Sequence, residues 1–342
     1  QIEAVYRNLA LDKPKNYFTI GIEDDVSLLS LPLPPARPQS DPDLVSCKFW
    51  GLGSDGTVGA NKNSIKIIGE NTDLYAQAYF EYDTKKSYGL TKSHLRFGKR
   101  PILASYLVKQ ADFIACHNQS YLRQYRIVNE LKPGGIFLLN CSWQPEELAE
   151  RLPAQVKREL AAKRARFYII DANAIARGIG LGDRNSMALQ AAFFALADII
   201  PLDQAVEQMK QAVAASFRKK GEQVVRLNMA AVDCGVSGAQ LIDIPADWAE
   251  AAEPPAAPAS EEPPFIRDIL RPLNAGQGDT LPVSAVLPYA DGTMPLGSTA
   301  YEKRCIASSL PIWGPEHCLQ CNRCALVCPH AVIRPYLLDQ KE

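Results

Sequence analysis

Four closely spaced cysteines carry the clearest chemical signal in this sequence. They are Cys318, Cys321, Cys324 and Cys328, and Pro329 follows directly, which gives the pattern C-x2-C-x2-C-x3-C-P. In ferredoxins with two 4Fe–4S clusters, the first three cysteines of such a run bind one cluster and the fourth binds the other. The pattern therefore predicts ligands for two clusters, each only partly ligated by this sequence, with the completing ligands expected beyond Glu342.

Zinc is the main alternative for these cysteines. Zinc modules also use C-x2-C pairs, but they usually add a second pair of cysteines or histidines to complete a tetrahedron. His317 and His330 flank the run and are interpreted as surface neighbours. Four further cysteines in apolar or strand-like settings are predicted to be buried thiols, namely Cys47, Cys116, Cys141 and Cys234. Metal ligands together with free thiols favour a reducing cytoplasm over an oxidising compartment.

A glycine-rich turn is the second chemical signal. Gly51, Gly53 and Gly56 satisfy G-x-G-x-x-G between a predicted strand and a predicted helix. Exposed amides and a helix N-terminus in that setting favour an anionic phosphate, although a tight turn that only connects two elements has the same spacing. No Gly-Lys-Ser/Thr closes the turn, which excludes a Walker A loop.

The next predicted strand helps to choose the ligand of this turn. An acidic residue at its end, Glu81 or Asp83, could hold the ribose hydroxyls of NAD. Lys85 and Lys86 follow at once and favour an additional phosphate, which NADP or coenzyme A would supply. The two lysines could also be only a solvated pair. NADP and coenzyme A both stay open on this argument.

Strand-like and helix-like runs alternate from Val45 onward. The predicted strands are 47–51, 76–82, 113–116, 135–140 and 167–170. Helices are predicted between them at 59–69, 120–131 and 146–163, and two or three more follow as far as Val236. Short apolar strands that alternate with helices indicate a parallel sheet covered on both faces. The predicted fold class is α/β, a doubly wound and mostly parallel sheet, followed by a linker and a partial ferredoxin-like iron–sulfur segment.

Composition divides the chain into four predicted parts. Residues 1–45 are proline-rich and form a connector, 46–244 form the α/β domain, 245–264 form a Pro/Ala/acidic linker, and 265–342 form the partial ferredoxin-like domain. A connector at the front, and a start at Gln1 rather than Met, predict a piece of a longer protein.

Charge and hydropathy exclude several classes of function. The 342 residues carry a formal net charge of -1, which argues against a nucleic-acid partner bound through bulk charge. No apolar stretch reaches eighteen residues and no charged-then-apolar leader is present, so neither a membrane span nor a secretory signal is expected. The expected location is the cytoplasm.

Several longer motifs resemble one enzyme family. They are GLGSDGTVGANK at 51–62, TKKS at 84–87, SHLRFG at 93–98, DFIACHN at 112–118, and LPVSAVLPYADGTMPLGSTAYEKR ahead of the cysteine run. Together they closely resemble pyruvate:ferredoxin oxidoreductase. The resemblance runs essentially from end to end of this chain, but it covers only the middle of that family's longer chain.

The resemblance implies a division of labour within a larger enzyme. In this family, pyruvate is decarboxylated on thiamine diphosphate with Mg, electrons leave through three 4Fe–4S clusters to ferredoxin or flavodoxin, and coenzyme A takes the acetyl group. The α/β part here would be the coenzyme A domain, in a homodimeric parent whose remaining domains are its partners. The residues that would contact coenzyme A are Gly53, Ser54, Asp55, Gly56, Thr57, Lys85, Asn185 and Asn228.

Departures from the family pattern limit what this chain is expected to do. It has no Gly-Asp-Gly followed by Asn-Asn, the pattern of a thiamine diphosphate site, and no second cysteine run. We therefore expect no catalytic residue here and no pyruvate oxidation by this polypeptide alone. The alternatives are a stand-alone nucleotide-binding α/β module with a zinc-binding tail, and an independent NADP-dependent oxidoreductase.

The two predicted asparagines also have purely structural interpretations. Asn185 could be only a helix N-cap, and Asn228 only a helix-surface residue. His94 and Arg96 are predicted to have a salt-bridged structural role.

Overall fold

The computed structural model describes residues 1–35, 42–83, 88–253, 262–302, 311–329 and 331–337. The chain divides into two units, Gln1–Arg304 and Cys305–Glu342, and each is described by itself. The domain boundaries expected from composition remain predictions.

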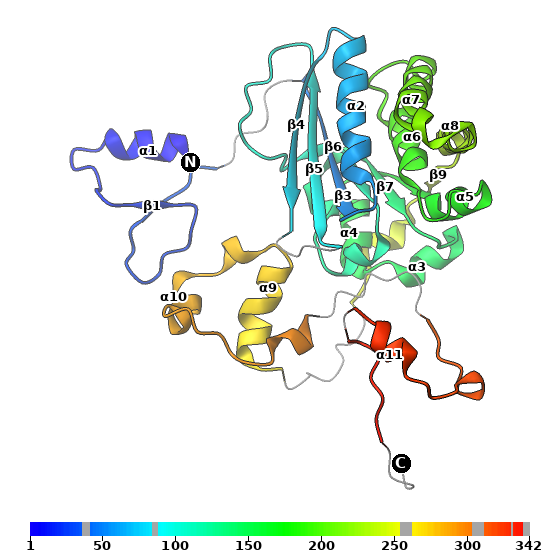
Figure 1. Cartoon of the computed structure of the whole chain (residues 1–342). Helices are drawn as coiled ribbons and strands as arrows, with labels where there is room; N and C mark the ends of the chain where they lie inside the picture. The colour runs from blue at the N-terminus through cyan, green and yellow to red at the C-terminus, as the bar shows by residue number, and fades with distance from the viewer. Residues whose placement is uncertain (36–41, 84–87, 254–261, 303–310, 330, 338–342) are drawn as a thin grey trace. The chain divides into compact units, whose positions relative to one another are not determined.

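A seven-stranded sheet forms the centre of the first unit (Figure 1). In sheet order its strands are β4 (Tyr75–Tyr82), β5 (Leu90–Gly98), β3 (Val45–Leu52), β6 (Ala111–Cys116), β7 (Leu131–Asn140), β8 (Arg166–Ile170) and β9 (Gln240–Ile242). The pairs β3–β6, β6–β7 and β7–β8 are parallel, whereas β5 and β9 run antiparallel to their neighbours. Since β4 is antiparallel to β5, five of the seven strands share one direction. The prediction of a mostly parallel α/β sheet is confirmed.

The five predicted strands are all present, but β5 and β9 were missed. β5 lies between β3 and β4 and pairs antiparallel with both. Its sequence alternates Lys92, His94 and Arg96 with Ser93 and Leu95. Basic side chains at every second position are typical of a strand, so the signal was available in the sequence, although His94 and Arg96 are themselves buried.

Four helices cover one face of the sheet. They are α2 (Thr57–Asn71), α6 (Ser186–Ala197), α7 (Leu202–Phe217) and α8 (Glu222–Ser237). Phe49 and Phe113 from the strands meet Phe193 of α6, with ring centroids 5.0 to 5.8 Å apart. Burial of three aromatic rings in one cluster supplies a large apolar area, so this face holds the main core.

The opposite face is covered by shorter elements. Phe137 and Phe167 stack there at 5.7 Å, and Trp248 lies 6.5 Å from Phe167. The covering elements are η1 (Gln119–Arg123), η2 (Val128–Glu130), η3 (Pro145–Glu147), α3 (Leu148–Arg151), α4 (Ala154–Ala162) and η5 (Ala246–Glu250). With both faces covered, the doubly wound arrangement is confirmed.

Three helix predictions need correction. The single helix expected over 120–131 is replaced by the two 3-10 turns η1 and η2. The helix expected over 146–163 is broken at Leu152, because Pro153 disfavours helical geometry in the residue before it. Four helices, not two or three, follow β8, because α5 (Ala172–Gly178) precedes α6.

The N-terminal segment contacts the segment that follows the predicted linker. It contains α1 (Ile2–Leu9), β1 (Thr19–Ile20) and β2 (Ser30–Leu31). The Glu23 carbonyl accepts a hydrogen bond from Val283 N–H at 2.9 Å, and the Asp25 carboxylate accepts one from Ser284 N–H at 2.9 Å. The N-terminal segment is therefore joined to residues 283–284 by one main-chain pair and by the Asp25 side chain.

Residues 262–302 form a small helical segment with its own cluster of buried side chains. Ile266, Ile269 and Leu270 pack there with Phe265, whose ring lies 4.8 Å from Tyr289. Its elements are η6 (Ile266–Leu270), α9 (Arg271–Asn274), η7 (Gly278–Thr280), α10 (Val283–Val286), η8 (Leu287–Tyr289) and η9 (Ser298–Tyr301). A further short turn of the first unit, η4 (Arg218–Lys220), joins α7 to α8.

The second unit is small and irregular. Within its described residues it has a 3-10 turn, η10 (Pro315–His317), and one short helix, α11 (Arg323–Val327). In the described part of the whole chain, no helix combines the length and the apolar character needed to cross a membrane.

Candidate functional site

The glycine-rich turn lies where the order of the strands reverses. From β3 the chain passes through α2 to β4 on one side of the sheet, and it later builds β6, β7 and β8 on the other side. In open α/β sheets, ligands bind at the carboxyl ends of the strands at such a switch point. The turn 53–56 directly follows the carboxyl end of β3 and is therefore placed where this fold binds ligands.

Two glycines of the turn are required by its geometry. Gly56 has φ +91°, and a Cβ added there would lie 2.9 Å from Ser186 Oγ. A Cβ at Gly53 would lie 3.1 Å from the carbonyl oxygen of Gly89, whose partner is the Gly53 N–H at 2.7 Å. At Gly56 the left-handed conformation favours glycine, and at Gly53 the close approach of the Gly89 backbone does. The turn is thus packed between the start of β5 and the start of α6.

The Asp55 side chain holds the two ends of the turn together by hydrogen bonds. Its carboxylate accepts hydrogen bonds from Leu52 N–H at 2.8 Å, from Thr57 N–H at 2.7 Å and from Thr57 Oγ1 at 2.8 Å. Hydrogen bonds to an ionised carboxylate are stronger than those between neutral groups. Asp55 therefore joins the last residue of β3 to the first residue of α2.

Several amides of the turn are left for a ligand. Among the described residues, the N–H groups of Ser54, Gly56, Val58 and Gly59 have no acceptor. They lie at the N-terminus of the fifteen-residue helix α2, where the helix dipole also favours negative charge. The arrangement can bind an anion through main-chain donors, as a phosphate site does.

His117 is a residue of this site that had no role in the sequence analysis. It follows β6 directly, and its Nδ1 lies 2.7 Å from Thr57 Oγ1. Burial lowers the pKa of His117, while the charge of Asp55 opposes that shift. The available signal was its position at the end of a predicted strand beside the predicted turn, where parallel strands gather functional side chains.

The predicted asparagines differ in their relation to the turn. Asn185 precedes α6 and its side-chain N–H donates to Asn173 Oδ1 at 2.5 Å, without capping the helix. The next residue, Ser186, is the one that packs against Gly56, so Asn185 lies beside the turn. Asn228 is buried in α8 rather than on its surface, and it donates to the Val224 carbonyl of its own helix at 2.8 Å.

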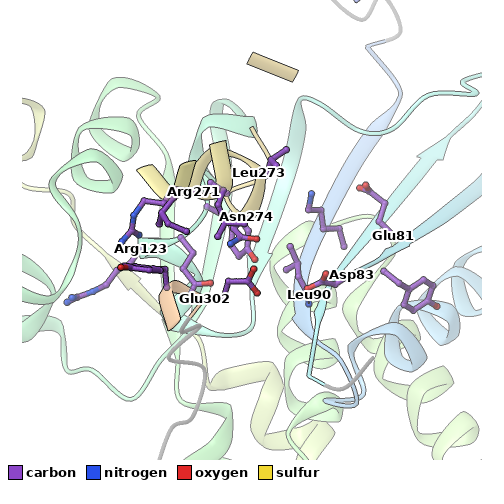
Figure 2. Close-up of a pocket in the computed structure, with 17 residues that line it drawn as sticks. Glu81, Asp83, Leu90, Arg123, Arg271, Leu273, Asn274 and Glu302 are labelled. Atoms are coloured by element: carbon purple, nitrogen blue, oxygen red, sulfur yellow. Dashed lines mark hydrogen bonds between the residues drawn. The ribbon is translucent and has the colours of Figure 1, made fainter. Parts of the chain in front are cut away.

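Lys85 lies outside the described residues. Its described neighbour Asp83 lines a cavity of about 510 Å³ beside the turn. Figure 2 shows Glu81, Asp83 and Leu90 on one wall of this cavity and Arg123, Arg271 and Glu302 toward the other. Leu90 pairs with Leu52 at the end of β3, so the cavity and the turn share the same strand ends.

Most of the cations around the cavity are engaged. Arg271 forms an ion pair with Glu262, and Lys92 lies 4.8 Å above the ring of Trp50. Arg123 is exposed, and no described side chain pairs with it. It is therefore available to an anionic group that enters the cavity.

His94 has the carboxylate partner that its predicted structural role requires, Glu81, whereas the described partners of Arg96 are neutral. Val108 N–H donates to His94 Nδ1 at 3.2 Å, so the ring carries its proton on Nε2, which donates to Glu81 at 2.5 Å. Burial lowers the pKa of His94, while the hydrogen bond to Glu81 opposes that shift. Arg96 donates to Gln77 Oε1 at 2.8 Å and to the Tyr106 carbonyl at 2.6 Å.

The cysteines of the second unit lie mostly on its surface. Cys318, Cys321 and Cys324 are exposed and Cys328 is half-buried. Cys318 Sγ accepts a hydrogen bond from Gln320 N–H at 3.4 Å, and this bond, with a contact from Trp313, lowers the pKa of the thiol. Cys328 Sγ accepts one from Val332 N–H at 3.3 Å. Across the described residues, no three His, Cys, Asp or Glu side chains converge as a metal site.

Three of the four other predicted core thiols are buried. Burial raises the pKa of Cys116 to about 12 and that of Cys141 to about 11, and it also raises the pKa of Cys47. Cys234 is exposed on α8, so its predicted burial is wrong. Its place between buried positions of an amphipathic helix misled the prediction.

A family model described as pyruvate ferredoxin/flavodoxin oxidoreductase matches residues 46–238. The chain belongs to this family. The match covers the whole sheet except β9 and includes the turn, His117 and both asparagines. A second family model, described as a domain of unknown function, matches residues 251–307.

Close relatives in the family extend the match over the whole chain. The chain is 54% identical to a pyruvate:ferredoxin oxidoreductase of Moorella thermoacetica and 53% identical to a pyruvate-flavodoxin oxidoreductase of Klebsiella pneumoniae. These alignments cover 98% and 100% of this chain but 28% and 29% of the relatives. It is also 45% identical to a mitochondrial pyruvate dehydrogenase (NADP+) of Euglena gracilis, over 99% of this chain and 19% of the relative.

Among solved structures, a pyruvate oxidoreductase subunit of Thermotoga maritima matches with a TM-score of 0.48 and 17% identity. The match covers 59% of this chain and 99% of that subunit. The chain thus spans less than a third of the length of the bacterial family members above.

Proposed function

We propose that this chain supplies the coenzyme A site and part of the electron path of a pyruvate:ferredoxin or pyruvate:flavodoxin oxidoreductase. In that reaction pyruvate is oxidatively decarboxylated, the acetyl group passes to coenzyme A, and ferredoxin or flavodoxin accepts the electrons. The observation that carries the proposal is the set of free amides in the Asp55-closed turn, at the switch point of a sheet that belongs to this family.

The turn suits a phosphate of coenzyme A better than the reactive end of the molecule. Main-chain N–H groups at a helix N-terminus bind phosphate without a catalytic side chain. The amides of Gly53 to Thr57 that are not used inside the turn would make these contacts, with Lys85 adding charge. Asn185 beside the turn would contribute an amide, and Asn228 would do so after leaving its bond to Val224.

The cavity next to the turn could hold a further part of the coenzyme A molecule. Small-molecule sites in proteins have volumes of roughly 300 to 1,000 Å³, which includes the 510 Å³ found here. Arg123 would meet a second phosphate of coenzyme A in this cavity. Arg123→Gln should then weaken binding, whereas Arg126→Gln should not, because Arg126 pairs with Glu159 at 3.1 Å.

Cys318, Cys321, Cys324 and Cys328 would be ligands of 4Fe–4S clusters. Two observations fit that chemistry, since N–H···S bonds already reach Cys318 and Cys328, and such bonds tune cluster sulfurs. When bound, the clusters would pass single electrons onward. The remaining domains of the enzyme would be the partners of this chain, in a cytoplasmic homodimer with thiamine diphosphate and Mg bound elsewhere.

Calorimetric titration with coenzyme A tests the ligand. We expect binding that weakens about tenfold on Lys85→Ala, as the loss of one charge-assisted phosphate contact predicts. Lys99→Ala is the matched control, because Lys99 follows the far end of β5. A folded protein that shows no binding of coenzyme A would contradict the proposal. Preferential binding of NADP would favour the independent NADP-dependent oxidoreductase. Zinc without acid-labile sulfide in the purified protein would remove the electron-transfer part.

A further inference from the structure

The ring of His117 is fixed at the strand ends by contacts on several sides. The main-chain N–H of His117 donates to the Trp50 carbonyl at 2.8 Å, and its main-chain carbonyl accepts from Asn140 Nδ2 at 3.0 Å. Its ring meets Phe49 edge to face at 6.2 Å. The carboxyl ends of β3, β6 and β7 therefore hold this histidine in place beside the start of α2.

The proton on its ring can be assigned by counting donors. The Thr57 hydroxyl has one proton and two close partners, Asp55 Oδ2 at 2.8 Å and His117 Nδ1 at 2.7 Å. An ionised carboxylate only accepts, so the hydroxyl proton lies toward Asp55. His117 Nδ1 must then carry the hydrogen and donate to Thr57. A protonated ring keeps the same donor, so this contact holds in either charge state.

We propose that His117 is a positioning residue for the glycine-rich turn, acting through a chain of hydrogen bonds from its Nδ1–H to Thr57 and from Thr57 to Asp55. This inference rests on the proposed coenzyme A function, since it explains how the amides of Ser54 and Gly56 keep their direction. Asp55 holds both ends of the turn, and His117 holds Thr57 in the rotamer that reaches Asp55. His117 is half-buried beside Thr57 and is not assigned a contact with the ligand.

His94 provides an internal reference for the assignment. It receives an N–H at Nδ1 and donates from Nε2, which is the opposite tautomer. Nitrogen-15 NMR of the ligand-free protein distinguishes the two forms, because protonated and unprotonated ring nitrogens differ widely in chemical shift. We expect His117 with hydrogen on Nδ1 and His94 with hydrogen on Nε2 near pH 7. Hydrogen on Nε2 alone at His117 would overturn the proposal.

Substitutions then test the effect on binding. In His117→Asn the side-chain amide lies close to the position of Nδ1 and can donate to Thr57, whereas in His117→Gln it lies near the position of Nε2. We expect His117→Asn to keep the affinity for coenzyme A within about threefold. His117→Gln and His117→Ala should each weaken it about tenfold or more, as the loss of one positioning hydrogen bond predicts. Equal affinity in all folded variants would overturn the proposal.

A second pair of variants covers the case in which His117→Ala does not fold. Thr57→Val keeps the shape of the side chain but removes the hydroxyl, and Thr57→Ser keeps the hydroxyl. We expect Thr57→Val to weaken coenzyme A binding as His117→Gln does, and Thr57→Ser to preserve it. If the unaltered protein binds no coenzyme A, the proposed function fails, while the NMR result still decides the hydrogen-bond chain independently.

Discussion

Gly235→Ala is expected to disturb the contact between α6 and α8. A Cβ added at Gly235 would lie 2.3 Å from the carbonyl oxygen of Ala188 and 2.7 Å from its Cα. Both atoms belong to the backbone of α6, so no side-chain rotation can relieve the overlap. The two helices would have to move apart, and the apolar side chains between them would lose contact.

The magnitude follows from two opposing terms. Replacing glycine by alanine inside a helix contributes up to about 1 kcal/mol in favour of folding. Overpacking costs about 1 to 3 kcal/mol, and a backbone obstacle belongs to the upper half of that range. We expect a net loss of roughly 1 to 2 kcal/mol, which lowers the melting temperature by about 2 to 8 °C in a domain of this size.

The same movement should reach the site. α6 begins at Ser186, which packs against Gly56 of the turn. Displacing this helix changes the wall behind the turn, so coenzyme A binding should weaken along with stability. A calorimetric titration below the melting range would measure this effect separately from unfolding.

Gly69→Ala is the matched control for stability. It is also a helix-interior glycine, but a Cβ there would meet only Ala76 Cβ, at an ordinary 3.6 Å. We expect stabilisation by about 0.5 to 1 kcal/mol from helix propensity alone. Urea unfolding followed through the buried Trp50 and Trp248 would compare the two variants. A Gly235→Ala protein at least as stable as the unaltered one would refute the reasoning from the close helix contact.

Two further perturbations address the buried polar groups. Burial lowers the pKa of His94 and of His117, so the unfolded state binds more protons than the folded state below pH 7. The free energy of unfolding should therefore fall as the pH drops from 7 to 5, by at most ~1.4 kcal/mol per pH unit for each histidine. His94→Gln keeps an N–H for Glu81 but cannot titrate, so its stability in urea should depend less steeply on pH. The exposed His317→Gln is the control and should leave the slope unchanged. Equal slopes for the His94→Gln and unaltered proteins would contradict a neutral His94 in the folded state. Asp55→Ala should lower the free energy of unfolding by about 2 kcal/mol, because two main-chain amides and the Thr57 hydroxyl lose their acceptor. Unchanged unfolding in urea would show that water replaces the carboxylate.

The sequence was sufficient to predict the parallel half of the sheet and the place of the turn. Apolar runs such as Phe113–Cys116 have no other stable position than a covered strand, and a glycine-rich turn after β3 has one fixed location. The antiparallel strand β5 was harder because its outward residues are basic and read as surface. His94 and Arg96 are buried instead, because they find partners in Glu81 and Gln77 of the neighbouring strand β4.

Residue roles were less predictable than residue positions. Pro153 marks the break between α3 and α4 in the sequence, and the prediction overlooked it, whereas no such residue marks segment 120–131 as 3-10 turns. Composition also cannot pair residues far apart in the chain. The contact between Thr57 and His117 joins positions sixty residues apart, and only the strand order brings them together.

This contact changes how the motif of the turn is interpreted. A list of motif residues treats Asp55 and Thr57 as equal members of a ligand site, but their side chains point to each other and to His117. A carboxylate that faced a phosphate would repel it, so its engagement with two amides and a hydroxyl removes that conflict. The side chains of the turn thus shape the backbone, and the backbone is the part suited to bind an anion.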